Sequence, residues 1–318
     1  MKRLLSILLS VLFVFVFCSC SQNTVEEAWS EKYLIGIDTN FELCQGLTDG
    51  DGKTAHVILL TGQSNCTGCS IISYLKDDVD EERFEGFSRG YGNILINYNI
   101  DNHRKCSAGQ FVKVDLDCGS TEKQFGPEVG IAETLHKSYP DELFIILKFS
   151  MSGYSLNYHW LKDGERGEIY LATYLFVKQS LDYIFACNFL VSFDAVMFMQ
   201  GESDTTTYKT SRYYDNLSNY VHFLREDFES YVTLDELYFI DAGISDSPYN
   251  EPCFEELNEQ KLKFSKDSPF NIYFSTIDNG LTTLNEPSYE PDLGHYDALS
   301  ELKLGNLFGE KYVEAIAL

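Results

Sequence analysis

The stretch of sequence that decides the fold is HVILLTGQSN, residues 56–65. Its first half, residues 56–60, is an apolar run of strand length, and Gly62 and Ser64 stand where that strand would end. A serine on a tight strand-to-helix turn presents its hydroxyl beside the free amides of the helix N-terminus, which stabilise a developing negative charge. Because serine is also a common helix N-cap, the stretch alone predicts the local fold more firmly than it predicts a reactive group.

Further apolar runs recur along the chain, at residues 143–149, 194–199, 236–241 and 271–275. Stretches with helical spacing lie between and after them, around 129–135, at 168–186, 211–231 and 255–264, and in a last segment that ends near residue 316. Short strands that alternate with helices predict a parallel sheet covered by helices on both faces. We therefore expect one three-layer α/β domain over residues 52–318, in which residues 72–125 are an excursion.

Polar segments that contain glycine stand next to the predicted strands and helices. SMSG (150–153) and QGESD (200–204) each follow a strand, and DLGH (292–295) precedes the last helix. In open α/β sheets the ligand site lies at the carboxyl ends of the strands. Each segment is a weak signal alone, but together with Ser64, in this order, they predict a hydrolytic site.

These segments resemble the sequence blocks of SGNH hydrolases: GQSN at 62–65, SMSGYSL at 150–156, QGESD at 200–204 and DLGH at 292–295. More narrowly, residues 56–310 are similar to the branch of sialate O-acetylesterases and acetylxylan esterases, carbohydrate esterase family 6. The resemblance implies a flavodoxin-like SGNH hydrolase fold and a serine esterase that removes O-acetyl groups from carbohydrates through an acyl-enzyme. Cys66 departs from the branch, which usually carries methionine after GQSN, but the departure leaves the catalytic groups unchanged.

Three residues are expected to carry the catalysis. Ser64 is the expected nucleophile, and His295 is the general base that takes its proton and later returns it to the leaving alcohol. Asp292 can reach the far ring nitrogen of His295 and fix the tautomer of the imidazole. Glu202 either orients the oxyanion loop or replaces Asp292 as the partner of the histidine. We favour Asp292, because Asp-x-x-His is the more compact arrangement.

The expected oxyanion hole combines the backbone amides of Ser64 and Gly153 with a side-chain amide. The wider SGNH group uses asparagine for that third donor, and the resemblance implies Gln200 in this chain. Loss of one such donor typically lowers kcat by about 10²–10³-fold. Asp204 is interpreted as an acid in the first turn of the following helix.

Other aromatic and imidazole side chains carry no clear chemical signal. Tyr154, Tyr158 and Trp160 follow the second block and either stack on a sugar face or contribute to ordinary packing. The remaining histidines lack a carboxylate or serine motif at useful spacing. We expect surface positions or satisfied core positions for His56, His103, His136, His159 and His222.

The N-terminal residues resemble a bacterial lipoprotein signal. Lys2 and Arg3 precede an apolar run that is short for a membrane span and ends near Cys20. We expect residues 1–19 to be removed, Cys20 to carry a lipid, and the protein to be exported to the cell envelope, with that lipid as its membrane contact. Plain secretion and a retained anchor are the alternatives. Residues 20–51 are expected to form a tether or an N-terminal cap.

Apart from Cys18 and Cys20, the chain has seven cysteines, so at least one thiol is unpaired if all bridges are internal. Cys106 and Cys118 are one pair that could close a loop. Cys66 and Cys69 form a C-x-x-C, but no second pair and no histidine at zinc-finger spacing accompany it, so we expect no metal site. A thiol-redox function of this pair is an alternative of a different class. No cofactor is expected.

Composition narrows the class of partner. The chain has 49 Asp and Glu against 24 Lys and Arg, and its formal net charge of −25 disfavours nucleic acid and electrostatic docking on an anionic membrane surface. We expect an acetylated carbohydrate as substrate, and a neutral one is the easiest to accommodate. The alternatives are an acetylxylan esterase or other short-chain ester hydrolase and, outside the enzymes, a glycan-binding surface lipoprotein.

Overall fold

The computed structural model describes residues 36–284, 286 and 292–316. From Ile37 onward they belong to one compact unit. The predicted signal peptide, residues 1–19, and the predicted lipidation site Cys20 lie outside the described residues.

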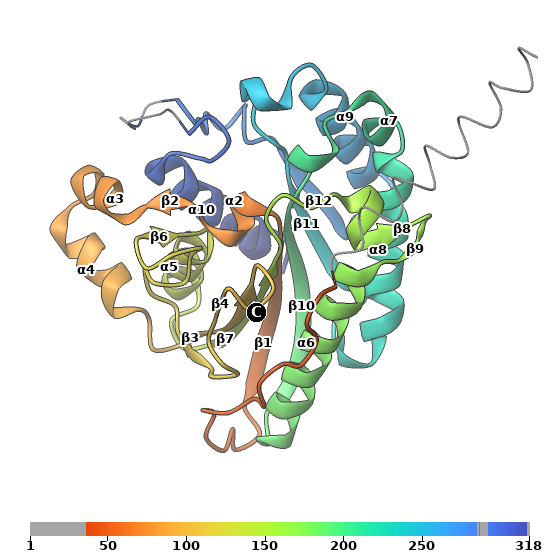
Figure 1. Ribbon diagram of the computed structural model, residues 1–318. Helices are drawn as coiled ribbons and strands as arrows, with labels where there is room; N and C mark the ends of the chain where they lie inside the picture. The colour runs from red at the N-terminus through yellow and green to blue at the C-terminus, as the bar shows by residue number, and fades with distance from the viewer. Residues whose placement is uncertain (1–35, 285, 287–291, 317–318) are drawn as a thin grey trace, which may run out of the picture. The chain divides into compact units, whose positions relative to one another are not determined.

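The centre of this unit is a mostly parallel sheet, which confirms the predicted fold class (Figure 1). Each apolar run predicted as a strand forms one. The parallel strands are, in spatial order, β3 (Ile94–Ile100), β7 (Leu143–Ser150), β1 (Thr54–Gly62), β10 (Leu190–Met199), β11 (Tyr238–Ala242) and β12 (Asn271–Phe274). Two short antiparallel strands pair with β3 at one edge, β4 (Lys105–Cys106) and β5 (Val112–Lys113).

The order of the strands determines where a ligand can bind. β1, the first parallel strand, lies between the third and fourth, β7 and β10. In flavodoxin itself the first strand lies between the second and third, so the position of β3 at the outside of β7 is a variation within the class. The chain crosses from one side of β1 to the other between β7 and β10, and such switch points form ligand crevices at the carboxyl ends of the strands. In the register of this sheet, those ends bring Gly62 opposite both Ser150 and Met199.

Helices cover both faces of the sheet (Figure 1). One layer contains α3 (Ile72–Asp78), α4 (Glu81–Arg89), α5 (Glu128–Ser138) and α10 (Ala298–Ala315), and the other contains α6 (Glu168–Ala186), α8 (Tyr213–Phe228) and α9 (Phe254–Ser265). The stretches with helical spacing therefore form the predicted helices. α10, which follows the DLGH segment, packs closely on α5: a Cβ at Gly305 would lie 2.0 Å from the carbonyl oxygen of Pro127.

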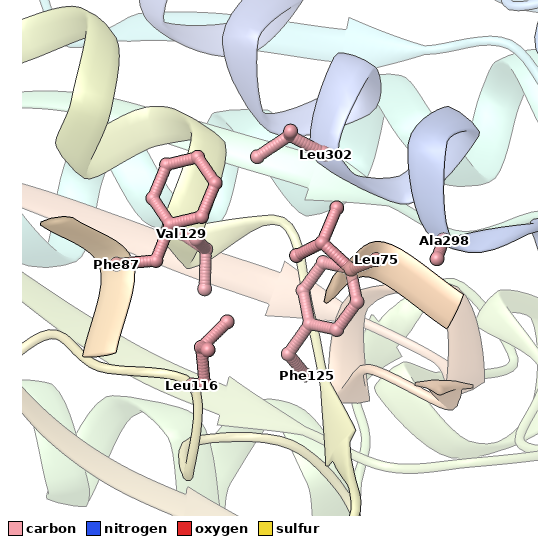
Figure 2. Close-up of a cluster of buried hydrophobic side chains, with 7 residues drawn as sticks. All are labelled: Leu75, Phe87, Leu116, Phe125, Val129, Ala298 and Leu302. Carbon is pink, nitrogen blue, oxygen red and sulfur yellow. The ribbon is translucent and has the colours of Figure 1, made fainter. Parts of the chain in front are cut away.

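A buried apolar cluster joins the 72–125 excursion to the rest of the unit (Figure 2). Full burial of each large aliphatic or aromatic side chain contributes about 1.5–3 kcal/mol relative to exposure. The excursion is therefore an integral part of the domain core, as predicted. The cluster consists of Leu75, Phe87, Leu116, Phe125, Val129, Ala298 and Leu302.

Residues 37–51, within the segment predicted as a tether or cap, also lie on this unit. The ring of Phe41 stacks on His103 with a centroid separation of 5.3 Å and meets Phe149 and Phe176 edge-on. The Gln45 amide donates to the carbonyl of Gly109 at 2.9 Å. These contacts pack Phe41 against β7, α6 and the segment after β3, and they join Gln45 to the loop at Gly109.

Candidate active site

Ser64 lies at the carboxyl end of β1, where the sequence places it. It is the first residue of the single-turn helix α2 (Ser64–Thr67), and its side chain is partly exposed. As the first helical residue, its amide has no intrahelical acceptor. The turn depends on Gly62, which has a φ of 151° and where a Cβ would lie 1.9 Å from the carbonyl oxygen of Met199. A side chain there would push β1 and β10 apart beneath the serine.

The Gln63 side chain fastens the QGESD segment to this turn. Its Oε1 accepts hydrogen bonds from the amide of Ser203 at 3.1 Å, the side chain of Gln200 at 3.3 Å and the amide of Gly201 at 3.4 Å. Gln63 is buried, so these bonds are shielded from competition with water. The segment after β10 is thereby held in register with Ser64.

His295 and Asp292 form a hydrogen-bonded pair. His295 Nδ1 lies 2.7 Å from Asp292 Oδ2, and the other carboxylate oxygen accepts from the Gly294 amide at 3.1 Å. A carboxylate at Nδ1 favours the tautomer with its proton there and leaves Nε2 free to accept a proton. The side chains of His295 and Asp292 are 28% and 58% exposed, so water reaches both groups.

Asn65 connects the nucleophile turn with the segment that carries His295. Its Nδ2 donates to Glu202 Oε1 at 2.7 Å and to the carbonyl of Gly294 at 3.3 Å, while its Oδ1 accepts from the Tyr296 amide at 3.2 Å. The asparagine is therefore hydrogen-bonded to the backbone on both sides of His295. Asn65 belongs to the GQSN motif, but its local sequence predicts no such contacts.

Glu202 bonds with Asn65, not with His295, among the described hydrogen bonds. One carboxylate oxygen accepts from Asn65, and the buried Oε2 has no hydrogen-bond partner in the described part of the chain. Burial raises the pKa of Glu202 above its ordinary value. Of the two alternatives kept open for this residue, the geometry matches that of an orienting group.

Two carboxylates hold the turn that follows β7, residues 151–155. Asp101, directly after β3, accepts from the Ser152 amide at 2.7 Å and from its hydroxyl at 3.1 Å. Asp204 accepts from the Ser155 hydroxyl at 2.6 Å. Gly153 lies between the two anchors with a φ of 78°, and no atom lies within 4 Å of where its Cβ would be. The backbone of this expected oxyanion donor is thus fixed from both sides beside open space.

Asp204 accepts hydrogen bonds from a helical turn that the sequence did not indicate. It does not cap α7 (Thr207–Thr210), whose N-cap makes no side-chain hydrogen bond. Asp204 is completely buried and accepts from the Leu156 amide at 2.8 Å, at the start of the π-helical turn η1 (Leu156–Trp160). Asp204 does lie in the first turn of the 3₁₀-helix η2 (Glu202–Asp204), as predicted, but its carboxylate is fixed by a segment almost 50 residues away, which was not predicted.

The side chain of Gln200 forms its hydrogen bonds inside the protein. Its amide donates to Asp204 Oδ2 at 2.6 Å, to Gln63 Oε1 at 3.3 Å and to the carbonyl of Tyr154 at 3.4 Å. Its Oε1 accepts from the Tyr213 hydroxyl at 2.9 Å, and the residue is completely buried. The amide hydrogens of Gln200 thus point to acceptors inside the protein, and its role as an oxyanion donor stays a prediction.

Replacement of Asp204 by asparagine is expected to lower the free energy of unfolding by about 3 kcal/mol. The amide NH₂ would replace one carboxylate oxygen and face the two donors that this oxygen now satisfies, which would remain buried without an acceptor. Urea unfolding measures the change, with the exposed Asp235→Asn as a matched control. Equal stability of the two variants would show that Asp204 does not hold the turn.

A cavity of about 230 Å³ lies beside His295 and Asp292. Since an engineered cavity of about 150 Å³ accepts benzene, this volume is sufficient for a sugar ring. His295 lines this cavity, whereas Ser64 is not among its described lining residues. Other described residues in its lining include Ile71, Tyr74, Gln124, Thr283, Glu286 and Asp297.

Glu301 is a completely buried carboxyl group on α10. Neither of its carboxylate oxygens has a hydrogen-bond partner in the described part of the chain. Burial raises the pKa of Glu301 well above its ordinary value, and the nearby carboxyl groups of Glu128 and Glu202 add to the shift. The group is therefore neutral in the folded protein at a pH where it is ionised in the unfolded chain.

This difference predicts that Glu301 makes the protein less stable as the pH rises above the ordinary glutamate pKa, because the unfolded chain then releases a proton that the folded protein keeps. Glu301→Gln is expected to unfold about 2–4 °C above the wild type at pH 8, with the gap closing near pH 4. Thermal unfolding at both pH values tests this, with the exposed Glu310→Gln as control. A gap independent of pH would contradict the prediction.

The aromatic residues named from the sequence separate into two groups. Trp160 is completely buried and belongs to the core, whereas Tyr154 and Tyr158 are partly exposed. Tyr249, which the sequence analysis did not single out, is 67% exposed and lies beside Gly294, one residue before His295. No periodic or motif signal in the sequence marks this tyrosine, since its position results from the folding of a separate loop.

The C-x-x-C cysteines are not arranged as reactive thiols. Burial raises the pKa of Cys66 well above its ordinary value and that of Cys69 to about 12, whereas reactive cysteines need a lowered pKa. The seven cysteines of the described residues are all free, so the suggested bridge between Cys106 and Cys118 is not formed. The thiol-redox alternative gains no support from this environment.

Within residues 36–284, 286 and 292–316, no three or more His, Cys, Asp and Glu side chains converge as a metal site would require. In the same ranges, no helix combines the length and the apolarity that crossing a membrane demands.

Comparison with known proteins identifies one matching family model. It is described as carbohydrate esterase, sialic acid-specific acetylesterase, and it matches residues 54–314. No curated protein sequence is similar enough to this chain to count as a match.

Solved structures share the fold at low sequence identity. The protein named NanS aligns with a TM-score of 0.60 and 15% identity, over 83% of this chain and 98% of its own. A protein of Arabidopsis thaliana gives 0.57 and 17%, over 81% and 98%. A carbohydrate acetylesterase of Xanthomonas citri gives 0.53 and 12%, over 82% and 56%. At these identities the likeness establishes the arrangement of the sheet and helices only.

Proposed function

Because the chain belongs to the family of carbohydrate esterases described as sialic acid-specific acetylesterases, we propose that it is a serine esterase that removes O-acetyl groups from carbohydrates. The observation that carries the proposal is the hydrogen bond between His295 Nδ1 and Asp292 Oδ2, in a segment that is hydrogen-bonded to Asn65, the residue after Ser64. A nucleophile, a base and a group that orients the base are the parts that acyl transfer needs.

In the proposed reaction, Ser64 Oγ attacks the acetyl carbonyl carbon while His295 Nε2 takes the serine proton. The tetrahedral intermediate collapses as the sugar oxygen leaves with that proton, and Ser64 holds the acetyl group as an ester. Water, deprotonated by His295, then attacks this ester, and acetate leaves as Ser64 regains its proton. Asp292 stabilises the imidazolium that forms in both steps.

The backbone amides of Ser64 and Gly153 are the proposed donors to the oxyanion. The Ser64 amide begins α2, and the anchors Asp101 and Asp204 support the turn that contains Gly153. Such fixed donors stabilise a charge that develops in the transition state without reorganising. Gln200 contributes indirectly in this scheme, through its bond to Asp204.

We also propose that the protein is an exported lipoprotein, on the basis of the charged start, the apolar run and Cys20. Lipidation is expected to place the esterase on the cell envelope. Incorporation of labelled palmitate into the full-length chain, and its loss in Cys20→Ala, tests this proposal. Equal labelling of the variant would contradict it.

Hydrolysis of p-nitrophenyl acetate, with and without a chelator, tests the proposed chemistry, and acetate release from acetylated sialic acids and acetylated xylan tests the substrate class. We expect activity that survives chelation and extends to at least one acetylated carbohydrate. Hydrolysis of simple esters alone would favour a general short-chain esterase. Binding of acetylated glycans without any acetate release would favour the glycan-binding alternative.

A further inference from the structure

The cavity beside His295 has an acidic lining. Among the described lining residues there is no lysine or arginine, whereas Glu286, Asp292 and Asp297 each contribute a carboxyl group. His295 is the described lining residue that can become positive, and it must be neutral to act as a base.

Neighbouring groups respond to this concentration of negative charge. The pKa of Glu286 rises to about 7, because the side chain is partly buried and because Asp297 and Asp78 repel its charge. The pKa of Cys69 rises mainly through burial, and the carboxylates of Glu301, Asp101 and Asp292, of which only Asp292 lines the cavity, add to the shift. Lys148 acts on Cys69 in the opposite sense, but it is completely buried and 2.6 Å from Glu128, which neutralises it.

The uncharged part of the lining suits a polyhydroxyl compound. Tyr74, Thr283 and Gln124 bring hydroxyl and amide groups to the cavity, and Ile71 adds an apolar surface from the strand β2 (Ser70–Ile71). A small number of polar groups on a partly apolar wall is the usual composition of a small-molecule site. Such a wall can bind sugar hydroxyls, but it offers a carboxylate no partner of opposite charge.

We infer that this cavity binds the sugar that carries the acetyl ester, and that its carboxyl groups select an uncharged sugar against one that bears a carboxylate. The inference rests on the proposed esterase function and narrows its substrate class. The description of the family names sialic acid, which carries a carboxylate, so the inference predicts a different preferred substrate for this chain. A like charge a few ångströms from the lining carboxylates weakens binding by a factor of about five or more, depending on how much water remains.

The decisive experiment compares two substrates that differ in one charge: 9-O-acetyl-N-acetylneuraminic acid and its methyl ester. At an ionic strength of about 10 mM we expect the methyl ester to have a kcat/KM about five- to tenfold higher for acetate release. The ratio should shrink at about 0.5 M salt, since added ions screen the repulsion. Equal values at both salt concentrations, or a preference for the free acid, would overturn the inference.

A charge placed in the cavity tests the same idea from the protein side. Ile71→Lys is expected to move the ratio several-fold toward the free acid, whereas the neutral, similarly long Ile71→Met should leave the ratio as in the wild type. An identical ratio in both variants would contradict the assignment. If no ester, including p-nitrophenyl acetate, is hydrolysed in a Ser64-dependent manner, the proposed function falls and the inference with it. If p-nitrophenyl acetate is hydrolysed but the sugar pair is not distinguished, the inference alone falls.

Discussion

Ser64→Ala is expected to lower kcat for p-nitrophenyl acetate by about 10⁴-fold or more. Alanine removes the oxygen that would form the acetyl-enzyme and leaves the amides of the turn in place. The fold should be unaffected, because the Ser64 side chain is partly exposed. Initial rates of nitrophenolate release measure the effect, and thermal unfolding establishes that the variant is folded.

Ser73→Ala provides a matched control for this change. Ser73 is an exposed serine on α3, and its loss should leave both the rate and the melting temperature within experimental error of the wild type. A folded Ser64→Ala protein that retains wild-type activity would exclude Ser64 as the nucleophile. Mass spectrometry of the wild type, quenched during turnover, should find an added acetyl group on the peptide that contains Ser64.

Asp292→Asn is expected to lower kcat by about 10³–10⁴-fold with little effect on KM. The asparagine can present its NH₂ group to His295 Nδ1 and so favour the tautomer in which Nε2 carries the proton, which cannot accept the proton of Ser64. The pair is partly exposed, so water can replace some of the lost bond, and the effect should be smaller than that of losing the nucleophile. Steady-state kinetics with p-nitrophenyl acetate measures both constants.

Glu202→Gln separates the two carboxylates that the sequence left in competition. Glutamine keeps an oxygen that can accept from Asn65 Nδ2, so the orienting contact survives and kcat should fall by no more than about tenfold. The opposite ranking, a severe loss in Glu202→Gln and a mild one in Asp292→Asn, would assign the histidine partner to Glu202. Both changes replace one carboxylate by an amide of the same shape. A difference between their rates therefore reflects the position of the carboxylate and not the loss of charge alone.

The features predicted correctly from the sequence are those fixed by nearby residues. The run at 143–149 forms β7 because its buried apolar side chains require cover on both faces, and 168–186 forms α6 with the predicted bounds. The turn at Ser64 follows from glycine and serine at the end of such a run. Even the pairing of Asp292 with His295 spans only three residues, so spacing was sufficient to predict it.

The features that were missed depend on contacts between distant segments. Asp204 and Gln200 are adjacent to a strand end, and their own neighbourhood does not reveal that Ser155 and Tyr213 consume their hydrogen-bonding capacity. The position of β3 outside β7 likewise depends on how the 72–125 excursion packs, for which local periodicity carries no information. The cavity also depends on contacts between distant segments, because its lining comes from residues 69–74 and 124 and from residues 283–297.

The hydrogen bonds of Asn65 to the backbone around His295 join segments that are 229 residues apart in the sequence. A ribosome that adds about 5–20 residues per second needs roughly 10–50 s to travel that far. Under the proposed mechanism, the nascent polypeptide then has its nucleophile but no base, and we expect it not to hydrolyse esters. Any message that ends before His295 yields an inert product for the same reason. The onset of hydrolysis therefore reports that synthesis of the chain has passed its last catalytic segment, a property that could time the maturation of this protein in a cell-free translation reaction.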